Sequence, residues 1–542
     1  MSGEGAPARK SLCRCKANDT KVPCVANQMQ RGAIDIRRFI LETHYPGYPI
    51  GEWFRDHGKE TAVDHLAKAE PGSRIVPMVV ATALLMETLD STVLTTAIPT
   101  IASALQTDPV HLKLALTAYL MSLAIFIPAS GWVADRCGAR RVFIAAIGIF
   151  TVASGLCALS QTLPQLVCGR VLQGIGGAMM TPVGRIIVVR SKNKHELIDA
   201  LSWVTIPAMI GPILGPLIGG LVITYASWHW IFLINIPIGL AGMILAARYL
   251  PTVPIIVRRF DALGFALSGL GLSMIIVAAS LLSIGGTDVP LAALAGTVAV
   301  ISLWAFAIHA RKAKEPILDL SLFQVPTLRS SLLGGTAFRI GVGASPFLMP
   351  LLLQLGFGMS ALASGMITFA AGAGALLMKL TAVPILKAIG YRRSLVVNGM
   401  VSAVLIATPV LFTSATPAWI MIALLLIVGF FRSLQFTAMN AMVFADVSED
   451  RMSAATTLAA VAQQIAASLG VSIAAIVLQL SRPSLASPLT THEFHAAFLV
   501  VAGISLLSVL GFRRLPEAAG QQLVEPVSKT PSPLSVGPHD RV

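Results

Sequence analysis

Long apolar runs constrain this chain more than any other feature. Between about residue 74 and residue 515, apolar runs alternate with short links. Because a helix needs about 20 apolar residues to cross a bilayer, each run predicts one membrane-spanning helix. With 55% apolar and only 12% charged residues, the composition also excludes an ordinary water-soluble protein. We predict fourteen spans, at residues 76–104, 110–133, 140–160, 164–189, 199–223, 228–250, 261–283, 288–309, 328–354, 361–384, 391–413, 417–441, 453–480 and 494–514.

Positive charge is concentrated in alternate links. Seven of the links or ends are rich in Lys and Arg, whereas the others are almost free of both, with Lys113 and Arg482 as the main exceptions. Positively charged links stay on the cytoplasmic side of a membrane, so this asymmetry predicts that both termini are cytoplasmic. It also accounts for the net charge of +14, and we therefore predict no nucleic-acid binding.

An internal repeat indicates how the spans are grouped. The link from Val383 to Arg393 aligns with the link from Gly131 to Arg141, and each follows the second span of a possible six-span half. The fold class predicted is an all-α integral membrane protein in a 6+2+6 arrangement. Its segments are an N-terminal extension at 1–73, a six-helix bundle at 74–250, two inserted helices at 251–315, a second bundle at 316–515 and a disordered tail at 516–542. The alternative for the extension is a start codon placed too early.

The link Gly131–Arg141 is charge-dense and glycine-punctuated. We expect Gly131 to permit a close helix approach and Gly138 to permit a tight turn. Asp135 is expected to bind an arginine or a helix N-terminus in one conformation and to lose that partner in another, as a gate. The alternative is a link that only fixes orientation through its arginines, which are Arg136, Arg140 and Arg141.

The fifth run contains glycines spaced four residues apart. Gly211, Gly215 and Gly219 therefore share one helix face, and small residues with this spacing favour close helix packing in lipid. Pro216 removes a backbone hydrogen bond and is expected to bend the helix, and Gly220 completes the motif.

Charged side chains inside spans are candidates for proton coupling. Glu87 and Asp90 lie three residues apart in the first span, so they share a face on which proton uptake is plausible. Arg170 lies in the fourth span, where either carboxylate is a possible partner. The alternatives are structural hydrogen bonds for the carboxylates and an interfacial position for the arginine. As side chains of a central cavity we predict Tyr119, Gln173, Arg339, Gln354, Asn440, Gln463 and Gln464.

These motifs resemble those of the major facilitator superfamily over about residues 75–515. The link Gly131–Arg141 resembles the superfamily's link between helices 2 and 3, with Val133 and Ala139 as departures. The run Gly211–Gly220 resembles its antiporter motif, and the segment from Arg170 to Gly177 resembles its span-4 motif. The run Leu89–Pro99 resembles the span-1 motif of fourteen-span drug:proton antiporters of the EmrB/QacA type.

The resemblance implies a proton-coupled multidrug efflux antiporter that exports amphipathic or cationic small molecules by alternating access. It implies a monomer in a bacterial inner membrane, driven by the proton gradient without a cofactor, with a separate adaptor needed for any route across the whole envelope. Same-fold exporters of a metabolite, peptide or siderophore, and a non-transporting sensor, are the alternatives. No nucleophile–base set or metal-ligand set is visible, so we predict neither an enzyme nor a metal site.

Overall fold

The protein is described by a computed structural model at residues 71–191, 194–252, 259–284, 289–448, 451–483, 487–516 and 519–520. These ranges contain helices and links, and no strand. The extension predicted at 1–73 and the tail predicted at 516–542 lie almost wholly outside the described residues.

The helices of the N-terminal half are α4 (Pro71–Ala104), α5 (Lys113–Cys137), α6 (Ala139–Ala158), α7 (Leu163–Ser191), α8 (Lys194–Tyr225), α9 (Trp230–Leu233) and α10 (Asn235–Tyr249). The central pair is α11 (Ala262–Ile284) and α12 (Val289–Lys312). The C-terminal half contains η2 (Leu320–Gln324), α13 (Pro326–Leu351), η3 (Leu352–Gly356), α14 (Ala361–Ile389), α15 (Tyr391–Ala407), η4 (Thr408–Leu411), α16 (Ala418–Phe444), α17 (Met452–Leu480) and α18 (Thr491–Arg513).

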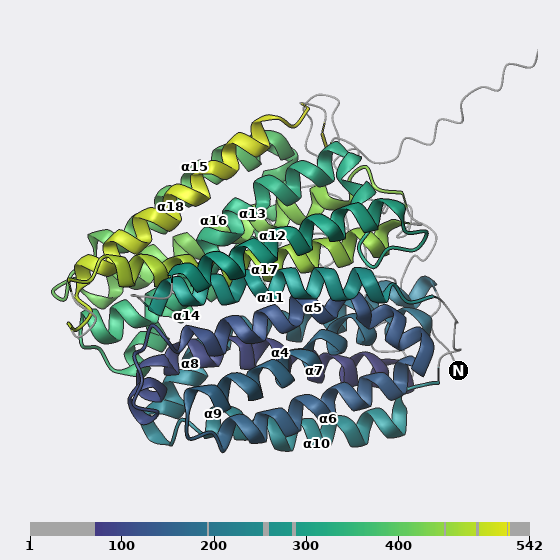
Figure 1. Ribbon diagram of the computed structural model, residues 1–542, viewed down its shortest axis with the longest axis horizontal. Helices are drawn as coiled ribbons and strands as arrows, with labels where there is room; N and C mark the ends of the chain where they lie inside the picture. Colours follow the sequence, from purple (N-terminus) through teal and green to yellow (C-terminus); the bar gives the residue numbers. More distant parts are fainter. Residues whose placement is uncertain are drawn as a thin grey trace, which may run out of the picture.

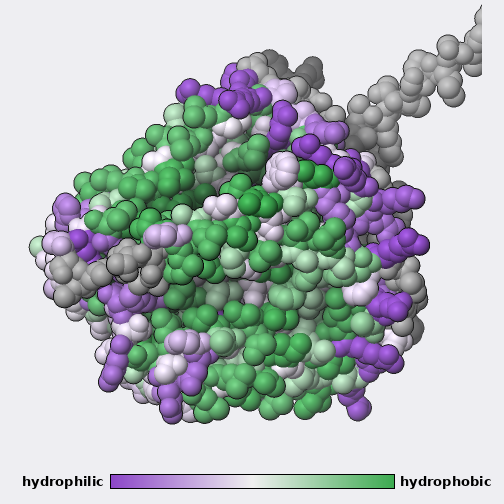
Figure 2. Space-filling view, in the orientation of Figure 1, coloured by the Kyte–Doolittle hydropathy of each residue, from purple (hydrophilic) through white to green (hydrophobic). Residues whose placement is uncertain are grey.

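Among the described residues, fourteen helical segments are long and apolar enough to cross a membrane, which confirms the predicted number of spans. Three of them combine two elements: α9 with α10, α13 with η3, and α15 with η4. Large apolar side chains are exposed along the outer helices, as on α12 and α18. Figure 2 shows apolar residues over most of the visible face, with hydrophilic residues gathered toward the ends of the helices. This surface suits a lipid environment, and the chain is a multi-pass membrane protein.

The six-span halves lie on opposite sides of the molecule, with the inserted pair between them (Figure 1). The main contacts between the halves are those of α8 with α14 and of α5 with α17, and α4 also packs against α13 and α14. Helix α11 packs against both α5 and α17, so the inserted pair covers one side of the junction. This arrangement confirms the predicted 6+2+6 order.

The internal repeat is present in three dimensions. Gly138 ends α5 with φ of 88°, and Gly390 ends α14 with φ of 81°, a backbone region that glycine tolerates best. An equivalent arginine follows each of these glycines. Arg140 donates a hydrogen bond to the carbonyl of Ala247 in the sixth span, and Arg392 donates to the carbonyl of Arg513 in the last span. Each half therefore uses the aligned arginine to bind a carbonyl at the C-terminal end of its sixth helix.

Candidate functional site

A buried ion pair lies in the interior of the N-terminal half. Nη1 of Arg170 on α7 is 2.5 Å from Oδ2 of Asp90 on α4, and both side chains are fully buried. Of the two carboxylates that the sequence offered as partners, the structure therefore selects Asp90. Full burial also excludes the interfacial position considered for Arg170. Removing one member of such a pair costs about 3–5 kcal/mol, because the other charge is left uncompensated.

Neutral side chains complete the surroundings of Asp90. Its Oδ1 accepts hydrogen bonds from Nε2 of Gln173 at 2.8 Å and from Nδ2 of Asn235 at 2.9 Å. Gln173 also donates to Ser154 and accepts from Arg170. We call Asp90, Arg170, Gln173, Asn235 and Ser154 the Asp90 network. Gln173 was predicted to line a cavity and instead lies in this network, whereas Asn235 and Ser154 were not singled out by the sequence analysis.

Tyr119 on α5 lies against the arginine of this network. The guanidinium carbon of Arg170 is 4.2 Å from the centre of the Tyr119 ring, a cation–π contact. The hydroxyl of Tyr119 and Nη2 of Arg170 are buried, and neither has a hydrogen-bond partner in the described part of the chain. Free hydrogen-bonding capacity next to a buried carboxylate suits a site whose proton content changes, because the partners can rearrange.

The chemistry available to the Asp90 network is competition for one carboxylate. Arginine keeps its charge in proteins, so Arg170 places a permanent positive charge beside Asp90. A proton on Asp90 would remove the negative charge that compensates Arg170, and the electrostatic attraction within the pair would be lost. A proton and Arg170 are therefore alternative ways to compensate the charge of Asp90.

Glu87 occupies a separate position one turn earlier on α4. Its Oε2 accepts a hydrogen bond of 2.7 Å from the Thr181 hydroxyl on α7, and its side chain is only partly buried. Arg185, one turn beyond Thr181, is near enough to interact with the charge of Glu87. Glu87 thus faces a more open environment than Asp90, although both lie between α4 and α7.

The glycine face of α8 packs against a threonine face of α4. A Cβ atom added at Gly211, Gly215 or Gly219 would collide with the side chain of Thr88, Thr92 or Thr96, respectively. This threonine–glycine contact confirms the predicted close packing. Gly220 faces the other way, and a Cβ atom added there would collide with the backbone of Ala361 on α14. Helix α8 is therefore packed closely against α4 on one side and against α14 of the second half on the other. Pro216 lies inside the continuous helix α8, and its carbonyl is close to Gly365 on α14.

One contact expected at the α5–α6 link is present, whereas its role as a gate stays a prediction. Asp135 is 93% buried, since its exposed fraction is 7%, and its Oδ1 accepts a hydrogen bond of 3.0 Å from Nη2 of Arg190 at the end of α7. Gly138 forms the tight turn, whereas Arg136 and Arg141 are exposed. The prediction for Gly131 is wrong, because nothing in the described part of the chain lies within 4 Å of a Cβ atom placed there. Its helix neighbours stand too far away to require a glycine.

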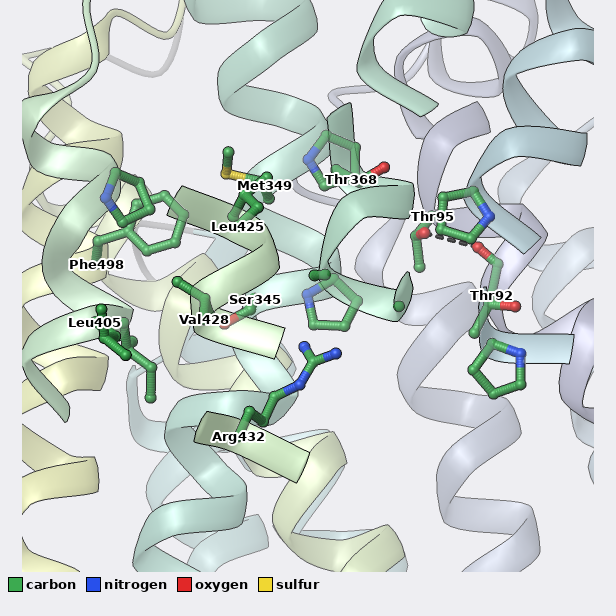
Figure 3. Close-up of a pocket in the computed structure, with 18 residues that line it drawn as sticks. Thr92, Thr95, Ser345, Met349, Thr368, Leu405, Leu425, Val428, Arg432 and Phe498 are labelled. Carbon is green, nitrogen blue, oxygen red and sulfur yellow. Dashed lines mark hydrogen bonds between the residues drawn. The ribbon is translucent and has the colours of Figure 1, made fainter. Parts of the chain in front are cut away.

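A cavity of about 150 Å³ lies between the two halves. Helices α4 and α8 line it on one side, and α13, α14, α15, α16 and α18 line it on the other. Figure 3 shows Thr92 and Thr95 on the first side and Arg432 pointing into the cavity from α16. The sequence analysis missed Arg432, although a charge within an apolar run was the available signal.

None of the seven side chains predicted for the cavity lines this one. Gln354 donates to the carbonyl of Thr96 at 2.9 Å and so joins the two halves, while Arg339 contacts Asn440 within the second half. Gln463 is exposed and Gln464 is partly buried on α17. Their roles in transport remain predictions.

Relatives of known name match most of the chain. A "Putative multidrug resistance protein MdtD" of Salmonella paratyphi A is 39% identical over 454 residues, which cover 82% of this chain and 96% of the relative. The protein of the same name from Salmonella typhi is 38% identical with the same coverage.

Solved structures share the fold at low sequence identity. The D-xylose-proton symporter superposes with a TM-score of 0.61 at 14% identity, covering 82% of this chain and 98% of the symporter. The nucleoside transporter NupG superposes with a TM-score of 0.54 at 16% identity, covering 82% and 98%. The model of the Major Facilitator Superfamily matches residues 80–261 and 331–536, leaving out the inserted helices. The chain therefore belongs to the major facilitator superfamily.

Proposed function

We propose that the protein is a multidrug efflux transporter that exchanges protons for amphipathic small molecules. The observation that carries the proposal is the ion pair of Asp90 and Arg170, which is sealed inside a membrane-spanning bundle. An intramembrane ion pair is costly to build and is usually retained for transport. The names of the Salmonella relatives support drug-like cargo, and the superfamily supports alternating access.

Coupling in this proposal follows from competition at Asp90. A proton that reaches Asp90 releases Arg170, and the contacts of Asp90 with Gln173 and Asn235 rearrange. Because Asp90 lies on α4, which lines the cavity with Thr92 and Thr95, the rearrangement is transmitted to the cargo site. Glu87 is a second proton acceptor, and the contact of Asp135 with Arg190 holds one conformation at the other end of α7.

The orientation and setting belong to the same proposal. The positively charged links support cytoplasmic termini in a bacterial inner membrane. We expect a monomer that needs no cofactor because the proton gradient supplies the energy, and it is a transporter rather than an enzyme. Export across a second membrane would need a separate adaptor protein.

Dye efflux from everted membrane vesicles tests the proposal. Vesicles with the wild-type chain should accumulate dye when a pH gradient is imposed and should stop when the gradient is collapsed. Asp90→Asn should abolish this dependence, whereas Asp446→Asn, which changes an exposed carboxylate, should leave it intact. Absence of flux over a broad cargo panel, with correctly inserted protein, would refute multidrug efflux and favour a dedicated exporter of one metabolite.

A further inference from the structure

Away from the helix ends, three cationic side chains lie inside the described spans of the C-terminal half: Arg339 on α13, Lys379 on α14 and Arg432 on α16. The sequence from Leu320 to Ala445 contains no aspartate or glutamate, and neither does α17. The spans that carry these cations therefore offer no carboxylate to neutralise them. The N-terminal half differs, because there Arg170 has Asp90.

The contacts of the three cations are neutral. Nζ of Lys379 donates to the Thr437 hydroxyl at 2.8 Å. Arg339 is 98% buried, since its exposed fraction is 2%, and reaches only the carbonyl of Ser331 at 3.5 Å and the Asn440 amide oxygen at 3.4 Å. Its Nε has no hydrogen-bond partner in the described part of the chain. Positive charge held in a bundle by neutral oxygens alone is costly, and an anion from outside the chain would relieve that cost.

Arg432 is the cation that reaches the cavity. Its guanidinium group points into the space between the halves, toward the side with Thr92 and Thr95 (Figure 3). Within the described residues Arg432 forms no ion pair and no hydrogen bond. A planar fork of donors at a cavity wall is suited to a carboxylate or a sulfonate.

Lys379 and Arg339 lie on helices that also line the cavity, but outside the cavity wall. Lys379 follows Gly372 by seven residues, which is about 10 Å at 1.5 Å per residue. Asn440, the partner of Arg339, follows Arg432 by eight residues, which is about 12 Å. Both lie toward the same end of the bundle, because α14 and α16 run in the same direction. Lys379 and Arg339 therefore lie on the side of the cavity that faces the positively charged links.

The rest of the cavity wall is apolar or carries hydroxyl groups. Met349, Leu425, Val428 and Phe498 supply apolar area, and Ser345 and Thr368 supply hydroxyls. The described residues of the wall include no carboxylate, so they offer no negative charge to pair with a cationic cargo.

We propose that the cargo is an amphipathic organic anion. Its acidic group binds Arg432, its apolar body lies against Met349, Leu425 and Phe498, and Lys379 and Arg339 add positive charge on the side of the positively charged links. This inference rests on the proposed transport function and reverses the cationic preference expected from the family resemblance.

Equilibrium binding to the purified full chain in phosphatidylcholine nanodiscs tests the inference. The probes are 4-phenylbutyrate, 4-phenylbutanol and 4-phenylbutylamine, which share one apolar body and differ in charge. We expect wild-type protein to bind the butyrate at least about tenfold more tightly than the amine, because a charge-assisted hydrogen bond is replaced by repulsion. Equal or tighter binding of the amine would overturn the proposal without any variant being made.

Variants then locate the site. Arg432→Gln should weaken butyrate binding about tenfold and change butanol binding less than about threefold, while Arg432→Lys should retain part of the preference. Arg329→Gln, an exposed position on α13, is the matched control and should behave as wild type. An unchanged preference in a folded Arg432→Gln protein would contradict the assignment.

A lipid headgroup is another source of the same anionic chemistry. Nanodiscs containing phosphatidylglycerol distinguish the two sources. If the soluble anion binds in phosphatidylcholine and phosphatidylglycerol competes weakly, the cargo assignment stands. If phosphatidylglycerol alone binds at Arg432, the site is a lipid site and the assignment fails. Gradient-driven export of cationic dyes without anion binding would refute this inference but leave the proposed function intact. Arg432-dependent anion binding without proton-driven flux would support this inference and refute the proposed function.

Discussion

The contact between α4 and α8 makes a quantitative prediction about Gly215. A Cβ atom at this position would collide with Oγ1 of Thr92, and it would lie 2.7 Å from Cβ of Thr92 and 3.3 Å from the backbone nitrogen of Val93. Carbon atoms pack at about 3.5 Å or more, so the helices must separate by about 0.8 Å. Overpacking of this kind costs about 1–3 kcal/mol, and the better helix propensity of alanine returns about 1 kcal/mol.

Gly131 supplies the matched control. It also lies inside a helix, but no described atom outside its own helix surroundings is within 4 Å of its added Cβ atom. Gly131→Ala should therefore gain only the helix propensity, so Gly215→Ala should be less stable than Gly131→Ala by about 1–3 kcal/mol. Reversible unfolding by SDS in mixed micelles, followed by circular dichroism, measures this difference.

A double-mutant cycle identifies the cause. Thr92→Gly removes the Cβ atom that the new methyl group of Gly215→Ala would meet, so the cost of Gly215→Ala should shrink in that background. Thr92→Ala removes the Oγ1 contact but keeps the Cβ atom 2.7 Å away, so it should leave part of the cost. The reasoning is wrong if Gly215→Ala is as stable as Gly131→Ala, or if both Thr92 backgrounds give the same result.

Three further predictions concern contacts at the ends of the bundle. Asp108→Asn should loosen the junction of the halves, because Arg482 loses a carboxylate 2.6 Å away. The population of the conformation that contains this contact should fall about fivefold, as measured by spin-label distances between the halves. An unchanged distance distribution would count against this prediction. Burial raises the pKa of Asp319, but hydrogen bonds from neighbouring groups and Arg451 outweigh it and hold that pKa below its usual value. Arg451→Gln should therefore cost at most about 1 kcal/mol above pH 5, and the loss should vanish as the pH falls below about 4, where the carboxyl protonates in the unfolded and then the folded protein; a constant difference in thermal stability over pH 3–7 would contradict this. Gly138→Ala should cost about 1–3 kcal/mol of unfolding free energy through its positive φ, and an unchanged SDS-unfolding midpoint would refute that strain.

The spans were predictable because each has a strong local signal. Twenty or more apolar residues have few alternatives to a membrane helix, and the glycine spacing of α8 specifies one face. The turn at Gly138 was predictable for the same reason, since its role depends only on its own backbone.

Contacts between distant segments were not predictable in the same way. The sequence left Arg170 with two possible carboxylates, and only the packing of α4 on α7 selects Asp90. Asn235 reaches the same carboxylate across 145 positions of sequence, with no local sign beyond a polar residue in an apolar run. The prediction for Gly131 failed because it assumed a contact that is not there. The motif suggested close packing, but no neighbouring helix among the described residues comes near Gly131.

Arg432 and Lys379 show a signal that was present but unused. A cation in an apolar run is informative, and its meaning here comes from the absence of any aspartate or glutamate between Leu320 and Ala445. The cavity then distinguishes the two, because it is lined by Arg432 and not by Lys379.

The measurement that tests the central claim most directly is proton movement driven by cargo in proteoliposomes with a pH dye inside. A cargo gradient imposed without a pH gradient should drive protons in the opposite direction through the wild-type protein. Asp90→Asn should lose this proton movement while still exchanging labelled for unlabelled cargo at equal concentrations, which shows that the variant is folded. Cargo flux without proton movement in the wild type, or undiminished proton movement in Asp90→Asn, would contradict coupling at Asp90.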